Sequence, residues 1–220
     1  MRLPFATLRR WLAGGRRRDA DDVTTGRWVV VDTETTGLDP ARDRLVAIGA
    51  VAVDDDGIRL DDSFEIVLQS MAPGAAASIE VHGIGQQAQA AGTPAAAALV
   101  AFRDWAAGAP RVGFHVDFDR AVLRNAALHA GVAMDEGSWL DLAPLAAAIA
   151  PEAHPRGGQS LDDWLTAFGI ECMSRHNAAA DALATAELLL RLRAIAARQG
   201  HAGYAALARI ARQRKWLGGR

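Results

Sequence analysis

The chain has little cysteine and no long apolar run. Cys172 is the only cysteine, so no disulfide can form within the chain and nothing in its cysteine content indicates an oxidising compartment. No apolar stretch approaches the ~20 residues that are needed to span a bilayer. Residues 1–18 are too often interrupted by arginine to contain the apolar segment of a secretory signal. These absences predict a cytoplasmic protein without a membrane span.

Acidic residues are also absent from both ends of the chain. Residues 1–18 contain six arginines, and residues 209–220 contain four arginines and Lys215, without any Asp or Glu. Subtracting these 11 cations from the 24 basic residues leaves 13 against 26 acids, so the rest of the chain has a net charge of about −13. Basic ends of this kind can hold a phosphate backbone or another anionic surface. The alternative is that they are solubilising tails.

The length and composition fit one folded domain with short appendages. With 220 residues, half of them hydrophobic, the chain can bury the core of one α/β domain. We expect a basic arm and linker at 1–26, the folded domain at 27–198, and a basic helix or tail at 199–220. Strands are expected early in the domain and helices later, which predicts a mixed sheet flanked by helices.

Individual elements follow from alternation, caps and chain breakers. Strands are predicted from Trp28, at 45–53, at 58–69 and at 111–114, with a hairpin turn at 54–57. Helices are predicted at 93–107, 117–129, 141–150, 160–169, 177–198 and 202–216. Their predicted amino-terminal caps include Thr93, Ser160 and Asn177.

Two carboxylates end the first predicted strand. Asp32 and Glu34 are two positions apart, and alternate side chains of a strand project to the same side. Two adjacent carboxylates beside an apolar core repel each other unless a divalent cation or a shared proton neutralises them. For an isolated Asp-x-Glu pair, a solvated strand end is the alternative interpretation.

Two later segments carry further acids beside predicted helix starts. Asp117 and Asp119 directly follow a strand, where the helix dipole favours a carboxylate and where one of the two can cap the helix. His176 and Asp181 are five residues apart and would point ~140° away from each other on one continuous helix. They can share a site only if His176 lies in a loop before a helix that Asn177 caps.

The four acids Asp32, Glu34, Asp119 and Asp181 are suitable metal ligands. Carboxylate oxygens without a cysteine in reach suit Mg²⁺ or Mn²⁺ better than a structural zinc. Two such ions held ~3.5–4 Å apart can activate a water and stabilise the leaving oxygen of a phosphoryl displacement. A histidine on a loop, such as His176, can take the proton of that water near neutral pH.

Three segments together resemble a known family. The segments are VDTETTGL at 31–38, FHVDFD at 114–119 and HNAAADA at 176–182. In order and spacing they resemble the exonuclease motifs of the DEDD superfamily, histidine subgroup, which includes the proofreading epsilon subunit of bacterial DNA polymerase III and stand-alone relatives. The similarity covers about residues 27–195. It implies a ribonuclease H-like fold with a mixed five-stranded sheet, two Mg²⁺ or Mn²⁺ ions, and hydrolysis of single-stranded nucleic acid from the 3′ end to 5′-mononucleotides.

The resemblance also implies roles for single residues. The metal ligands would be Asp32, Glu34, Asp119 and Asp181, and the general base would be His176. The 3′-terminal nucleotide would be held by residues after the first acid pair and by the histidine of VHGI at 81–84. These predicted substrate contacts are Thr35, Thr36, Gly37, Leu38, which would wedge against the last base, and His82.

One motif departs from the family pattern. Relatives often have His-Asn five and four residues before the third acid, where this chain has Phe114 and His115. No metal ligand is lost, so activity should survive, but polar contacts near the scissile bond can differ. His115 has two interpretations, a core histidine bonded to backbone or a substrate contact. Asp141 is interpreted as a structural acid.

Several functional alternatives accompany this interpretation. We expect DNA as the substrate, and the alternative is an exoribonuclease that trims or degrades short RNA, since the same catalytic residues serve both. An alternative from another functional class is a binding subunit. Its basic ends would dock a polymerase or bind nucleic acid, and its catalysis would be secondary. A P-loop nucleotide-binding site has little support, because the P-loop lysine is absent. Acyl-transfer catalysis has little support, because no Gly-x-Ser-x-Gly segment is present.

Overall fold

The computed structural model describes residues 26–70, 79–80, 82–135, 137–154 and 160–218. Apart from Gly26, the predicted arm and linker at 1–26 therefore lie outside the described residues. Within the described ranges, no helix is long and apolar enough to cross a membrane.

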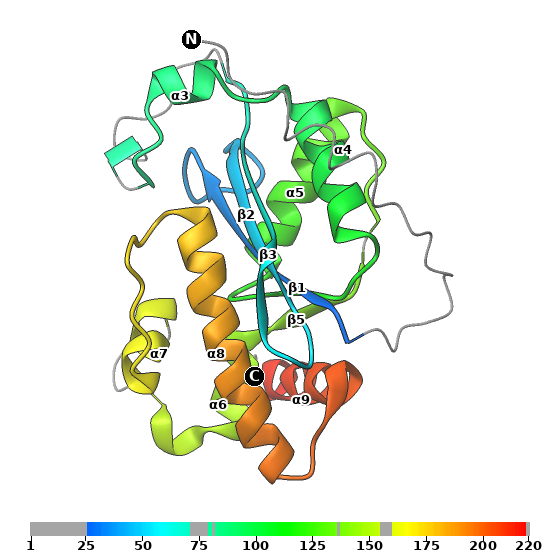
Figure 1. Ribbon diagram of the computed structural model, residues 1–220, viewed down its shortest axis with the longest axis vertical. Coiled ribbons are helices and arrows are strands. Elements are labelled where there is room, and N and C mark those ends of the chain that lie inside the picture. Colours follow the sequence, from blue (N-terminus) through cyan, green and yellow to red (C-terminus); the bar gives the residue numbers. More distant parts are fainter. Residues whose placement is uncertain (1–25, 71–78, 81, 136, 155–159, 219–220) are drawn as a thin grey trace.

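A five-stranded mixed sheet forms the centre of the domain (Figure 1). Its order is β3-β2-β1-β4-β5, with antiparallel pairing of β1 to β2 and β2 to β3 and parallel pairing of β1 to β4 and β4 to β5. The carboxyl ends of β1, β4 and β5 therefore meet at one edge. The strand bounds are β1 Trp28–Thr35, β2 Leu45–Val53, β3 Ile58–Val67, β4 Arg111–Gly113 and β5 Trp139–Asp141.

Helices cover both faces of this sheet. The bounds are α3 Gln86–Ala90, α4 Ala95–Ala106, α5 Asp117–Ala130, α6 Leu142–Ile149, the 3₁₀ helix Pro151–Ala153, α7 Leu161–Phe168, α8 Ala178–Arg198 and α9 Gly203–Gly218. Buried residues of α4 and α5 form one hydrophobic core with the sheet, and those of α6 to α9 form the other. The predicted α/β fold with a mixed five-stranded sheet is confirmed.

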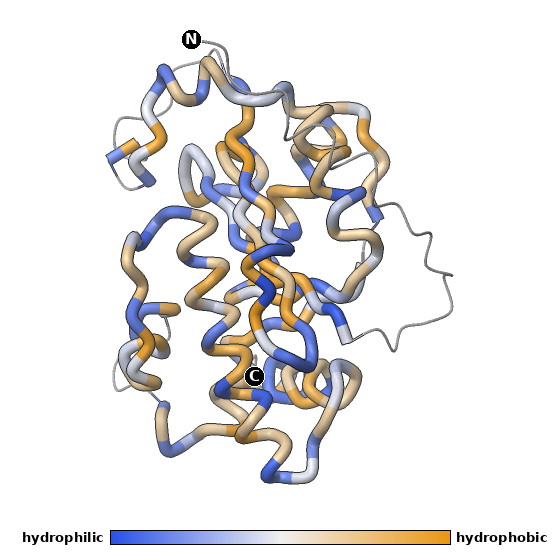
Figure 2. The backbone as a smooth tube through the Cα atoms, viewed as in Figure 1, coloured by the Kyte–Doolittle hydropathy of each residue, from blue (hydrophilic) through white to orange (hydrophobic). Residues whose placement is uncertain are grey.

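The alternation of β1 decides which face each of its side chains reaches. Val29 and Val31 belong to the core under α4 and α5, whereas Trp28 and Val30 belong to the core under α6 to α9. By the same alternation, Asp32 projects toward the face that α8 covers and Thr33 toward the face of α5. The chain is hydrophilic where it enters α8, at the edge of that face (Figure 2).

Two predicted helix caps are wrong. Thr93 does not cap α4, because its backbone continues the pairing beyond β3: its N–H donates to Val67 O at 2.9 Å and its carbonyl accepts from Gln69 N at 2.7 Å. The helix begins after Pro94 instead, without a side-chain cap. Neither acid at the start of α5 caps it either, since Val116 occupies the cap position.

Two other caps are confirmed. Ser160 forms a capping box with Asp163 at the start of α7, and that helix ends at Gly169 as predicted. Asn177 Oδ1 accepts a hydrogen bond from Ala180 N at 3.0 Å, so α8 begins where the sequence predicts.

Candidate metal centre

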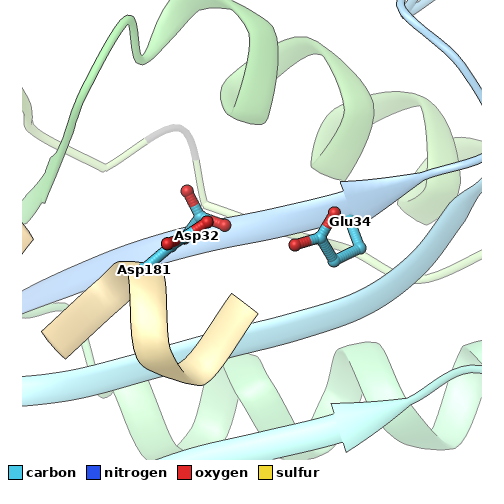
Figure 3. A group of neighbouring side chains, drawn as sticks. All are labelled: Asp32, Glu34 and Asp181. Carbon is cyan, nitrogen blue, oxygen red and sulfur yellow. The ribbon is translucent and has the colours of Figure 1, made fainter. Parts of the chain in front are cut away.

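Three carboxylates meet above the sheet beside the start of α8. One carboxylate oxygen from each of Asp32, Glu34 and Asp181 lies within 4.8 Å of the other two. Figure 3 shows the first two on β1 and Asp181 reaching them from α8. The structure thus brings together three of the four predicted metal ligands.

The start of α8 can reach these acids because β2 has a glycine opposite Asp32. Asp32 pairs with Gly49 in the β1–β2 register. A Cβ atom at Gly49 would lie 2.1 Å from the carbonyl carbon of Ala178, the first residue of α8. Only glycine therefore permits this close approach of the helix to the sheet. The first turn of α8 then places Asp181 beside the β1 acids.

His176 lies in the loop before α8, as the spacing requires. Its backbone φ is 61°, in the left-handed region that non-glycine residues seldom adopt, and its side chain is exposed. Its backbone N–H donates to Asp181 Oδ2 at 2.9 Å. One carboxylate therefore fixes the backbone of the predicted general base. The role of His176 as a base stays a prediction.

Asp119 approaches from the other face of the sheet. It is buried in the first turn of α5, and its Oδ1 accepts a hydrogen bond from Thr33 Oγ1 at 2.7 Å. It is not part of the group of three, but its charge raises the pKa of Asp32, so the two are electrostatically close. Burial raises the pKa of Asp119 itself to about 7, although the hydrogen bond from Thr33 lowers it.

The acids of the site are buried and lie close to one another, so their ionised forms are destabilised. Burial raises the pKa of Asp32 well above its usual range, and the charges of Asp119, Asp181 and Glu34 raise it further. Burial and the charge of Asp181 raise the pKa of Glu34 to about 8. Such shifts indicate a place where a cation would be strongly stabilised. An all-oxygen donor set of this kind fits Mg²⁺ or Mn²⁺.

Arg175 is a site residue that the sequence interpretation missed. Its guanidinium donates to Asp181 and to Asp162 of α7. Its charge lowers the pKa values of Asp32 and Glu34, against the larger effect of burial. Its position directly before His176 is the only signal in the sequence, because the partner acid Asp162 lies in a separate segment.

The expectation that no cysteine reaches the site is wrong. Cys172 Sγ lies 3.4 Å from Asp181 Oδ1 and donates to it. Burial raises the pKa of the Cys172 thiol. The protonated thiol is a poor metal ligand, so the donor set remains carboxylate oxygen.

The predicted substrate contacts after β1 form a hydrogen-bonded loop. Thr35 Oγ1 donates to Gly37 O at 2.6 Å, and Thr36 Oγ1 donates to Asp43 Oδ1 at 3.0 Å. Leu38 is 91% exposed at the tip. An exposed leucine on a hydrogen-bonded loop beside the carboxylates is free to contact a ligand.

The two remaining predicted contacts lie outside the carboxylate group. His82 is buried, its Nδ1 accepts from Ile84 N at 3.0 Å, and its Nε2 has no hydrogen-bond partner among the described residues. His115 is exposed, so its interpretation as a core histidine is wrong. Its backbone N–H donates to Asp141 Oδ1 at 2.9 Å, and the same oxygen accepts from Ala143 N at the start of α6. Asp141 thus has the structural contacts expected of it.

Comparison with known proteins gives a family for the chain. Residues 29–189 match the model of the exonuclease family RNase_T. The DNA polymerase III subunit epsilon-like protein of Rhodobacter capsulatus is 37% identical over 169 residues, which are 75% of this chain and 23% of that protein. The PolC-type DNA polymerase III of Caldanaerobacter subterraneus subsp. tengcongensis is 27% identical over 167 residues, 76% of this chain and 12% of that protein.

Solved structures share the fold. E. coli exonuclease I in complex with a dT13 oligonucleotide superposes with a TM-score of 0.68 and 21% identity, covering 79% of this chain and 42% of that one. The chain thus spans less than a quarter of the curated relatives and less than half of exonuclease I. The sheet and its flanking helices have the ribonuclease H-like fold of these neighbours. With its acidic motifs in order and its family model matched over most of the length, the chain belongs to the exonuclease family, within the DEDD superfamily.

Proposed function

We propose that this protein is a metal-dependent 3′-to-5′ exonuclease that hydrolyses single-stranded DNA to 5′-mononucleotides. The observation that carries the proposal is the convergence of Asp32, Glu34 and Asp181 within 4.8 Å at the end of β1. The raised pKa values of Asp32 and Glu34 support a cation as the ligand of this site, since burial and the charges of neighbouring acids otherwise favour the protonated forms of these two. The segment 27–198 is the proposed catalytic domain.

Four acids would hold two Mg²⁺ or Mn²⁺ ions: Asp32, Glu34, Asp119 and Asp181. Bound ions of this kind supply charge neutralisation for a phosphodiester and lower the pKa of an attacking water. Thr33 has a positioning role, because its hydroxyl holds Asp119 at the edge of the sheet. Asp181 has a double role, since it also fixes the backbone of His176.

His176 is the proposed general base. Its side chain is exposed at the rim of the site, where it can take the proton of the attacking water and pass it to solvent. A loop position before α8 lets the imidazole move while Asp181 stays on a firm helix. Histidine is the side chain that most often serves in proton transfer of this kind.

The 3′-terminal nucleotide is proposed to bind on the loop that follows β1. Thr35, Thr36 and Gly37 would contact its backbone, and Leu38 would pack against the last base. His82 and His115 are further proposed contacts. A DNA substrate is supported by two relatives named for DNA polymerase III and by the DNA oligonucleotide bound to a structural neighbour. A polymerase is a proposed partner of the basic termini on the same grounds.

The experiment is a digestion assay with purified protein and Mg²⁺ or Mn²⁺. Single-stranded DNA, paired DNA, mismatched ends and RNA are compared, and the products are identified by mass. We expect 5′-mononucleotides from single-stranded DNA at the highest rate. A higher rate on RNA would make the protein an exoribonuclease, and no mononucleotides from any of the four would contradict the proposal.

A further inference from the structure

Helix α9, Gly203–Gly218, lies entirely after the family match, which ends at residue 189. Its first half is anchored in the domain: Leu207, Ala208 and Ala211 are buried, and Tyr204 packs edge-on against Trp28 with ring centroids 5.4 Å apart. From residue 212 to 217 every side chain is exposed. The second half of the helix therefore presents an exposed surface, while it stays against the domain through the ion pair of Lys215.

This surface is basic and aromatic. The whole of α9 has no Asp or Glu, and it carries Arg209, Arg212, Arg214 and Lys215. Trp216 is 62% exposed next to them. Residues three and four apart share one face of a helix, so Arg209, Arg212 and Lys215 form a stripe that ends beside Trp216. We call these four side chains the α9 stripe.

An ion pair directs the α9 stripe toward the candidate metal centre. Lys215 Nζ pairs with Asp117, two residues before Asp119 on α5. Burial raises the pKa of Asp141, and the charges of His115 and Lys215 act against that shift, so the end of α9 also lies near β5. Figure 1 shows the carboxyl end of α9 directed toward the middle of the molecule. The end of the stripe that carries Lys215 and Trp216 thus lies near the sheet edge where the acids meet.

We propose that the α9 stripe holds the single strand of DNA upstream of the nucleotide being removed. The inference rests on the proposed function, which places the 3′ end at the β1 loop. Charge complementarity favours this occupant, because the acidic body would repel a phosphate backbone that the arginines attract. Trp216 supplies a flat ring for a base, and stacking of this kind tolerates any sequence. Cations beside an aromatic are the usual combination in single-strand binding grooves.

The test measures binding apart from catalysis. Fluorescence anisotropy of a labelled oligothymidylate, in EDTA and over a range of salt, gives the dissociation constant and its salt slope. The variants are Arg209→Gln with Arg212→Gln, and Trp216→Ala. The matched control is Arg191→Gln with Arg198→Gln, two exposed arginines on α8 outside the stripe.

We expect the double stripe variant to flatten the salt slope by about 1.4, since each phosphate contact on a single strand contributes ~0.7. We expect Trp216→Ala to weaken binding roughly tenfold, whereas the α8 control behaves as the wild type. Equal dissociation constants and slopes in all variants would overturn the proposal. A change in self-association without a change in DNA binding would also overturn it, and would assign the surface to a second copy of the chain.

A small chromogenic substrate separates this proposal from the proposed function. The nitrophenyl ester of thymidine 5′-monophosphate occupies only the nucleotide site, so its turnover should be the same in the wild type and the stripe variants. On long DNA the stripe variants should raise KM and leave kcat unchanged. In another outcome, the wild type cleaves neither substrate while the stripe variants still lose DNA affinity. That outcome would contradict the proposed exonuclease function and support DNA binding by the α9 stripe.

Discussion

Arg175 forms an ion pair with Asp181, so a cationic side chain already contacts one of the three converging carboxylates. The same guanidinium contacts Asp162 of α7. Asp181 is 4% exposed, and so its charge is stabilised by few waters. A divalent ion that binds Asp181 must therefore compete with Arg175 for its oxygens.

Removing this competitor should strengthen metal binding. We expect Arg175→Gln to bind Mg²⁺ or Mn²⁺ roughly fivefold more tightly, which corresponds to about 1 kcal/mol. Asp162→Asn should have the opposite effect, because Arg175 then has only Asp181 as a partner. Isothermal titration calorimetry measures both. Weaker metal binding by Arg175→Gln would mean that the guanidinium supports the site rather than competing for it.

Substitutions of Asp181 and His176 should affect metal binding and turnover differently. Asp181→Asn removes the charge of a proposed metal ligand and leaves one oxygen where the carboxylate has two, so metal binding and turnover should both be lost. His176→Ala removes only the proposed base and should lower kcat by ~10²–10⁴-fold while metal binding stays near that of the wild type. Calorimetry and rate measurements on both variants check this division, and equal loss of metal binding would refute it.

The metal-free protein should become less stable as the pH rises. The pKa of Glu34 is raised to about 8 in the folded protein, far above its value in an unfolded chain, so the folded state binds more protons between these two values. The stability that protonated Glu34 contributes is therefore fully present below the pKa of Glu34 in the unfolded chain. It is lost as the pH rises through about 8. We expect Tm in EDTA to fall between about pH 5 and pH 8.

Glu34→Gln provides the control for this pH dependence. The variant cannot ionise at this position, so its Tm should fall less over the same range. Added Mg²⁺ should reduce the fall in the wild type, because the ion stabilises the ionised acids. A wild-type Tm that rises with pH in EDTA would contradict the assignment of raised pKa values.

Gly49 should be required for the site to assemble. Gly49→Ala places a Cβ atom 2.1 Å from the backbone carbonyl carbon of Ala178, so α8 must shift away from β2 and from the sheet. We expect a loss of about 1–3 kcal/mol in the free energy of unfolding and weaker metal binding. Gly85→Ala is the matched control, since a Cβ there has no heavy atom within 4 Å and φ is −66°. Equal effects of the two substitutions would contradict this role.

The local features of the site could be predicted from the sequence. Alternation along β1 placed Asp32 and Glu34 on one side, and the spacing of His176 and Asp181 required the loop that the structure contains. The cap at Asn177 is likewise local, because its acceptor and donor are three residues apart. Patterns of this kind depend on neighbouring residues alone.

Features that depend on distant segments could not be predicted in the same way. Thr33 holds Asp119 across 86 positions of sequence, and Lys215 pairs with Asp117 across 98. Helix α5 has no side-chain cap hydrogen bond, and the two acids in its first turn have these distant partners instead. Thr93 was misassigned for the same reason, because its pairing beyond β3 overrides its local preference as a cap.

The central claim is tested most directly by digestion of single-stranded DNA labelled at its 5′ end, with Mg²⁺, EDTA and the Asp181→Asn variant as the three arms. The account predicts a ladder that shortens from the 3′ end and releases 5′-mononucleotides with Mg²⁺ alone, and no cleavage in EDTA or by the variant. Release of the label as the first product, internal cuts, or equal cleavage by Asp181→Asn would contradict it.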